Sequence, residues 1–123
     1  MNIIIADDSK VMRSIIGKAV DSLGHNILYA CNGQEVMDYL EKCCDEIELI
    51  LLDWNMPVLT GFEVLQQMQE NFKYQNIPVL MVSTEAEDKK VAQAREAGAC
   101  GYLAKPFTME DLESAIKAVT GSS

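Results

Sequence analysis

Five short apolar segments alternate along this chain with five longer segments in which apolar residues recur at a helical period. The short segments cover residues 3–6, 27–31, 49–52, 79–83 and 101–104. Runs of this length and content predict strands, and their alternation with helices predicts a parallel sheet with right-handed crossovers. We therefore expect an α/β fold, a doubly wound five-stranded parallel sheet with five helices on its two faces.

The helical segments have local boundary signals. The first, 10–23, can be capped by Ser9 and ended by Gly24, the second opens at residue 32 or 33, and the third follows Thr60. The fourth covers about 89–97 and has the weakest apolar stripe, so we expect it to be the least anchored. The last starts after Thr108, which can cap it. A frayed tail is expected at 121–123. The apolar stripes comprise Val11, Met12, Ile15, Ile16, Ala19, Val20 and Leu23; Val36, Met37 and Leu40; Phe62, Leu65, Met68 and Phe72; Val91, Ala92 and Ala94; and Met109, Leu112, Ile116 and Val119.

Composition narrows the classes of function. The 123 residues fit one domain, 1–123, and the net charge of −9 argues against binding to nucleic acid or to an anionic membrane. We find no signal peptide and no apolar run long enough to span a bilayer, so a cytoplasmic protein with reduced thiols is expected. With one histidine and no CxxC pair, a zinc site is not expected. The four cysteines are expected to be small buried apolar residues: Cys31, Cys43, Cys44 and Cys100.

Acidic residues follow two of the predicted strands. Asp7 and Asp8 come after the first strand and Asp53 after the third, at the edge of a parallel sheet where ligands bind. Three carboxylates that meet there would repel one another unless a cation joined them. Oxygen ligands without histidine suit Mg²⁺. Each aspartate alone is about as well explained as a helix cap, but the set together favours a metal site.

The ends of two further strands carry a cation and hydroxyl groups. Lys105 follows the fifth strand and could pair with the acids and with a phosphoryl oxygen. Ser83 and Thr84 end the fourth strand, where a hydroxyl can donate to the same oxygen. Singly, a solvated lysine and a turn-forming serine are the ordinary interpretations. Their combination with the acids favours a phosphoryl-transfer site.

The order and spacing of these motifs closely resemble the receiver domain of two-component response regulators, over residues 3 to about 119. The motifs are Asp7-Asp8-Ser9, Asp53-Trp54-Asn55-Met56-Pro57 with Gly61, Val82-Ser83, Gly101-Tyr102 and Lys105-Pro106-Phe107-Thr108. The details are most similar to the stand-alone chemotaxis regulators of that family. The resemblance implies the strand order 2-1-3-4-5 and a single receiver domain.

The resemblance also implies a role for each site residue. Asp53 would accept a phosphoryl group from a histidine kinase, and Lys105 would pair with that group after a cis bond to Pro106. Asp8, Asp53 and the backbone carbonyl of Asn55 would ligate Mg²⁺, for which Mn²⁺ could substitute, and Asp7 would act through a water molecule. The domain would catalyse only its own phosphorylation and dephosphorylation, so it is not expected to be an enzyme in the usual sense.

A switch and a partner face are implied in the same way. Ser83 would move onto the phosphoryl group and Tyr102 would rotate inward, changing the face built by the fourth helix, the fifth strand and the fifth helix, with Val91 and Asp88. The downstream protein would be a flagellar motor switch or a histidine phosphotransfer protein, and the chain is expected to be a monomer.

Departures from the family pattern concern the partner and the lifetime of the phosphoryl group. Asp88 and Ala115 stand where the chemotaxis regulators carry lysines, while Lys89, Lys90 and Lys117 lie nearby. Thr84 could alter access to Asp53, and polar Asn55 and Glu85 suggest a short-lived phosphoryl group.

Three other functions compete with the switch. A phosphorelay shuttle stays open. A flavodoxin-type carrier lacks its Ser/Thr-rich phosphate loop, and a Mg²⁺-dependent phosphatase would need an acid where Asn55 stands. From the length, no DNA-binding output domain is expected.

Overall fold

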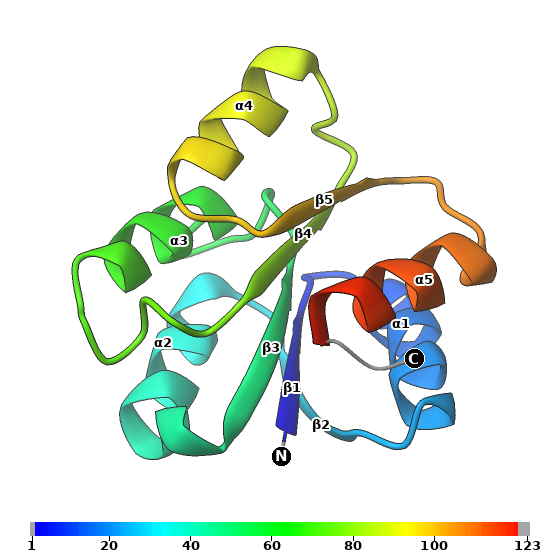
Figure 1. Cartoon of the computed structure of the whole chain (residues 1–123), viewed down its shortest axis with the longest axis horizontal. Helices are drawn as coiled ribbons and strands as arrows, with labels where there is room; N and C mark the ends of the chain where they lie inside the picture. Colours follow the sequence, from blue (N-terminus) through cyan, green and yellow to red (C-terminus); the bar gives the residue numbers. More distant parts are fainter. Residues whose placement is uncertain (1, 121–123) are drawn as a thin grey trace.

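The computed structural model describes residues 2–120 and shows the expected α/β architecture (Figure 1). The strands pair in parallel in the order β2-β1-β3-β4-β5, which confirms the predicted topology. The tail expected at 121–123 lies outside the described residues. The strands are β1 Asn2–Ala6, β2 Asn26–Ala30, β3 Ile47–Leu52, β4 Val79–Ser83 and β5 Gly101–Ala104. The helices are α1 Lys10–Ser22, α2 Gly33–Cys43, α3 Gly61–Gln69, α4 Asp88–Glu96 and α5 Met109–Thr120, with a short 3₁₀ turn at Cys44–Glu46 that the sequence did not suggest.

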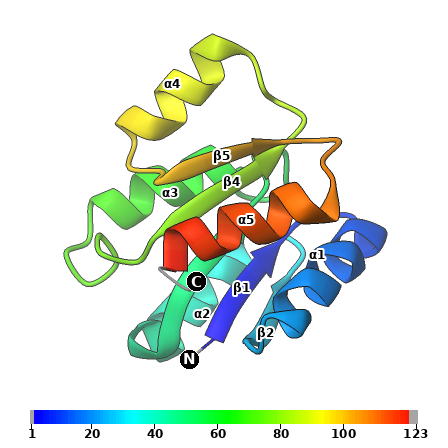
Figure 2. The ribbon, with the colours of Figure 1, turned by 45° about the vertical axis from the view of Figure 1, so that its right-hand side comes forward.

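The sheet is buried on both faces, and successive strand residues point to opposite sides. Ile4 and Ala6 of β1 pack into the core on the α2 and α3 side, which also includes Ala94 of α4. Ile3 and Ile5 pack into the core beneath α1 and α5. Figures 1 and 2 show these two helical layers, with α4 beside β5 and with α3 between α4 and α2.

Most helix starts carry the caps that the sequence predicts. Ser9 accepts a hydrogen bond from the Met12 amide, and Thr108 accepts one from the Asp111 amide. Gly24 and Gly98, at the ends of α1 and α4, have the positive φ angles of 85° and 109° that favour glycine. Helix α4 differs, because its N-cap residue Glu87 makes no side-chain capping hydrogen bond.

Several residues of the predicted apolar stripes are exposed and not buried. Phe72 is 79% exposed because α3 ends at Gln69, so the helical period does not continue to it. Val11, Ile15 and Met109 are also exposed, on the first turns of α1 and α5 or their outer side, and Ala92 is exposed on α4. Only Ala94 of α4 is buried, which confirms the weak anchoring of that helix.

The prediction of buried cysteines is wrong. Cys31 and Cys100 are exposed and Cys43 and Cys44 are half-buried, because they lie at the ends of strands and helices and not in their middles. All four cysteines are free thiols. Among the described residues, no helix is long and apolar enough to cross a membrane.

Candidate functional site

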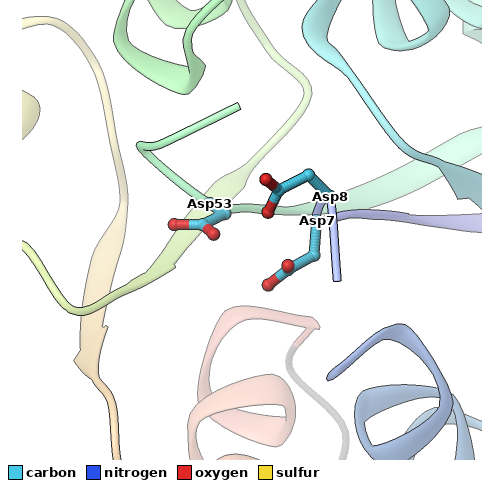
Figure 3. A group of neighbouring side chains, drawn as sticks. All are labelled: Asp7, Asp8 and Asp53. Carbon is cyan, nitrogen blue, oxygen red and sulfur yellow. The ribbon is translucent and has the colours of Figure 1, made fainter. Parts of the chain in front are cut away.

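Asp7, Asp8 and Asp53 meet at the carboxyl edge of the sheet, as the sequence predicts (Figure 3). One carboxylate oxygen from each can be chosen so that all three lie within 4.8 Å of one another. Asp7 and Asp53 are buried, whereas Asp8 is exposed. The cluster therefore has two acids held in the protein interior and one acid that faces solvent.

The backbone of each strand end holds these residues in place. The Asp7 amide donates to the carbonyl of Ala30 on β2, and the Asp53 amide donates to the carbonyl of Ala6 on β1. The Lys105 amide donates in the same way to the carbonyl of Ser83 on β4. The site residues thus continue the hydrogen-bond ladder of the sheet, and the core beneath them fixes their positions.

Lys105 joins the two buried acids. Its Nζ lies 2.6 Å from Oδ2 of Asp7 and 3.2 Å from Oδ2 of Asp53, and its bond to Pro106 is cis, as predicted. Burial alone would lower the pKa of Lys105, but the hydrogen bond to Asp7 and the charges of Asp53 and Asp7 together outweigh it and raise that pKa. Lys105 therefore remains a cation at neutral pH.

The carboxyl group of Asp53 is held at an electrostatic cost. Burial raises its pKa above the ordinary value, and the charge of Asp7 acts in the same direction. The charge of Lys105 and hydrogen bonds from Lys105 and Ser83 oppose the rise without cancelling it. One lysine beside three aspartates leaves negative charge uncompensated, so a cation bound here would be favoured.

The loop after β1 is tied by Arg13, which the sequence analysis did not single out. Its Nη1 donates to the backbone carbonyl of Asp7 at 2.7 Å, and the Ser9 amide donates to Oδ1 of Asp7 at 2.9 Å. The only available signal was spacing, because Arg13 lies on the first turns of the helix that follows the acids. Arginine is common on helices, so the spacing of Arg13 from the acids does not by itself identify it.

The loop after β3 turns sharply away from Asp53. The Asn55 amide donates to Oδ1 of Asp53 at 3.3 Å, and a Cβ on Gly61 would clash with the carbonyl oxygen of Asp53. Val58 has a φ angle of 69° while the Leu59 amide donates to the Pro57 carbonyl, which forms a γ-turn with positive φ. That conformation is strained for a β-branched residue.

Glu85 connects the residues predicted to form the switch. Its amide donates to Oγ of buried Ser83 at 3.1 Å, and its carbonyl accepts a hydrogen bond from the hydroxyl of Tyr102. Its carboxylate accepts a hydrogen bond from Nδ2 of Asn55 at 3.3 Å. Burial raises the pKa of half-buried Tyr102, so its hydroxyl keeps the proton that it donates.

The residues expected on a partner face lie further out. Asp88 is exposed at the first residue of α4, and Val91 is half-buried one turn later. Ala115 is half-buried on α5, while Lys89 and Lys117 are exposed. The structure gives these residues no direct contact with the acid cluster, so their role as a partner face stays a prediction.

The donor chemistry of the cluster fits a hard divalent cation. The three aspartates offer oxygen atoms, and no histidine or cysteine belongs to the group. Mg²⁺ uses one or two carboxylates and keeps several waters, which suits one exposed and two buried acids. The backbone carbonyl of Asn55 stays a predicted further ligand.

Comparison with known proteins agrees with this geometry. Residues 3–117 match the family model of the response regulator receiver domain. A chemotaxis protein CheY homolog of Campylobacter jejuni is 36% identical over 123 residues, covering 99% of this chain and 94% of the relative.

Solved structures give the same result. Vibrio cholerae CheY4 superposes with a TM-score of 0.88 at 30% identity, covering 96% of this chain and 97% of that chain. The Borrelia burgdorferi CheX-CheY-BeF3-Mg²⁺ complex gives a TM-score of 0.90 at 26% identity, covering 97% of this chain and 88% of that chain.

Receiver domains bind Mg²⁺ at an acidic pocket, and Asp7, Asp8 and Asp53 form such a pocket here. The chain belongs to the family of response regulator receiver domains, and within it to those of the CheY type found in chemotaxis.

Proposed function

We propose that this chain is a stand-alone phosphorylation switch, in which Asp53 accepts a phosphoryl group from a histidine kinase and thereby changes a protein-binding face. The observation that carries the proposal is the placement of the Asp53 carboxylate, buried at a sheet edge between two further acids and paired with Lys105. Relatives that match over nearly their whole length are chemotaxis proteins, which supports a role in chemotaxis.

In the chemical step, the phosphoryl group passes from the kinase histidine to Asp53. An oxygen of Asp53 forms a bond to phosphorus as the bond between phosphorus and the kinase histidine nitrogen breaks. The bonding electrons stay on that nitrogen, and because the other ring nitrogen of the phosphohistidine carries a proton, the products are an acyl phosphate and a neutral imidazole. Lys105, already 3.2 Å from Asp53, would compensate the charge that builds on the phosphoryl oxygens. Ser83 would supply a hydroxyl donor to the same group from the end of β4.

Asp8 and Asp53, with the Asn55 carbonyl, would hold Mg²⁺ or Mn²⁺ directly, and Asp7 would hold it through water. Bound there, the cation would neutralise charge on both the carboxylate and the anionic donor. The residues around the cation have further roles. Asp7 is committed to Lys105 and the Ser9 amide, so it orients the lysine and stabilises the loop that carries Asp8.

The change at Asp53 would reach the partner face through Glu85. If Ser83 turns toward the phosphoryl group, its Oγ leaves the Glu85 amide, and the Glu85 carbonyl also holds the Tyr102 hydroxyl. A single displacement would therefore alter Tyr102 and the start of α4 together. The face formed by α4, β5 and α5, including Val91 and Asp88, would present the result to a flagellar motor switch or a histidine phosphotransfer protein.

Labelling with a radioactive acyl phosphate in Mg²⁺ tests the phosphoacceptor. We expect Asp53→Asn to abolish the hydroxylamine-sensitive label, and Asp45→Asn, an exposed aspartate on the 3₁₀ turn, to leave it intact. Undiminished labelling of Asp53→Asn would reject the assignment.

Titration with the metal tests the cation site separately. We expect Mg²⁺ or Mn²⁺ to change the fluorescence of Trp54, which adjoins Asp53, and to raise the melting temperature by mass action. Asp8→Asn should weaken both responses, because it removes a carboxylate without disturbing the buried pair. Equal responses in the wild type and the variant would contradict a direct role for Asp8.

A further inference from the structure

Lys90 contacts the phosphorylation loop from α4, although no family motif includes it. Its Nζ lies 4.8 Å from the centroid of the Trp54 ring and 3.6 Å from Oε2 of Glu85. Trp54 in turn stacks on Phe62 of α3, with ring centroids 4.8 Å apart and an angle of 15° between the planes. Lys90 therefore completes a stack that runs from α3 through the loop to α4.

The carboxylate of Glu85 needs such a partner. It accepts a hydrogen bond from Asn55, two residues after Asp53, and it lies in a region that already holds three aspartates and one paired lysine. An unpaired fourth carboxylate at this edge would repel an anionic phosphodonor. The ammonium group of Lys90 is the cation that the structure places against it.

We propose that Lys90 is a positioning residue for the phosphorylation of Asp53. It holds Glu85 against Asn55, neutralises the Glu85 charge at the entrance to the site, and fixes the Trp54 ring beside the phosphoacceptor. This inference rests on the proposed function, because it concerns how readily an anionic donor reaches Asp53.

The neighbouring lysine offers a matched control. Lys89 has the same charge and adjoins Lys90 on α4, but it is exposed, whereas Lys90 is half-buried. Loss of either side chain changes the net charge equally. Only loss of Lys90 removes the contacts with Glu85 and Trp54.

The first experiment measures the second-order rate constant of phosphorylation by a small anionic acyl phosphate, using radiolabel so that Trp54 is not the probe. A half-buried ion pair near the surface has a modest energy, so we expect Lys90→Met to lower the rate about threefold at an ionic strength of about 0.15 M. Lys89→Met should leave it within about 1.5-fold, since long-range charge effects are screened. Lys90→Arg should restore the wild-type rate, and Glu85→Gln combined with Lys90→Met should do the same by removing the unpaired carboxylate.

A second measurement does not depend on phosphorylation. The emission of Trp54 in the untreated protein should change in Lys90→Met and not in Lys89→Met, because only Lys90 lies over the ring. If the wild type is never labelled, the proposed function fails while this signal still tests the contact. Equal phosphorylation rates of the two methionine variants, or a double variant as slow as Lys90→Met, would overturn the inference, and equal emission would show that Lys90 does not contact the Trp54 ring.

Discussion

Helices α3 and α4 have the same length, nine residues, and lie on the same side of the sheet, yet they are attached in different ways. Helix α3 buries Val64, Leu65 and Met68 and begins with a capping box at Thr60. Helix α4 buries only Ala94, and its N-cap residue makes no side-chain hydrogen bond. In its first turn, Lys90 contacts Glu85 through an ion pair and the Trp54 ring through a cation–π interaction.

The difference shows which parts of a switch have to be fixed and which have to respond. Each fully buried leucine contributes about 1.5–3 kcal/mol, whereas an ion pair near the surface contributes about 0–1 kcal/mol. On the proposed function, a chemical event at Asp53 would therefore compete with the contacts of α4 and not with those of α3. The loop that carries Asp53 leads into the firmly held helix, which would keep the acceptor in place while α4 adjusts.

The largest expected effect is on the core beneath α3. Leu65→Ala removes a fully buried side chain and should lower the free energy of unfolding by about 3 kcal/mol. Val91→Ala on α4 removes less from a half-buried position and should cost less than about 1 kcal/mol. Urea denaturation followed by circular dichroism measures both. Equal losses would remove the contrast between the two helices.

The sequence predicts the common framework of both helices because its signals are local. Apolar runs and caps predicted the alternating strands and helices, and the residues at strand ends predicted the meeting of Asp7, Asp8 and Asp53. The strand order came from the resemblance to the receiver family. In a parallel sheet all strand ends of one direction share an edge, so a residue's place in its own strand suffices to bring distant acids together.

The errors concern features that depend on neighbours distant in the chain. Phe72 continues the period of α3 by count, but the helix has already ended, and no local pattern shows where the core stops. The contact of Lys90 with Trp54 and Glu85 depends on how α4 is rotated about its axis, which its weak apolar stripe does not determine. Cys31 and Cys100 were misplaced because cysteine composition gives no position within an element.

The N-terminal caps of α3 and α4 also differ, and we expect this difference to change the free energy of unfolding by about 1 kcal/mol. In α3 the Glu63 amide donates to Oγ1 of Thr60 at 3.1 Å, and the Thr60 amide donates to Glu63 at 3.0 Å. Thr60→Ala should therefore destabilise the protein by about 1 kcal/mol. Glu87→Ser gives α4 the cap that it lacks and should stabilise it by about 0.5 kcal/mol, with Glu87→Ala as control. Thermal unfolding measures both, and a destabilising Glu87→Ser would show that α4 cannot accept a cap.

Val58 is a strained residue in the loop that leads into the firmly held helix α3. It is 75% exposed with a φ angle of 69°, a conformation that asparagine adopts more readily than valine. Val58→Asn should thus raise the free energy of unfolding by about 0.5–1 kcal/mol. Val11→Asn is the matched control, since Val11 is also exposed but lies in helix α1, where the change should be neutral or slightly destabilising. Equal effects of the two substitutions would mean that the γ-turn is not strained.

The smallest effect concerns Cys100, which follows α4 and precedes β5. The residue as a whole is exposed, but its Sγ lies 3.0 Å from the carbonyl oxygen of Val79. This partial burial raises the pKa of the thiol, because the thiolate is disfavoured where part of the group is removed from water. A raised pKa means that the folded protein keeps the proton to a higher pH than the unfolded chain. Below that pKa the thiolate is therefore the minor form, and alkylation by iodoacetamide at pH 8 should be slower in buffer than in urea.

The difference between the alkylation rates in buffer and in urea should narrow as the pH rises through the raised pKa of Cys100, where the folded thiol also ionises. Mass spectrometry of the peptide containing Cys100 measures the alkylation rate in buffer and in urea. The thiol donates to the carbonyl of Val79 on β4, and the turn before it is tied to α4 by the Ala99 amide, which donates to the carbonyl of Ala94. If α4 is held as loosely as its contacts indicate, Val91→Ala should therefore speed the alkylation of Cys100. A Cys100 that reacts as fast folded as unfolded at pH 8 would show that the fold gives its thiol no protection.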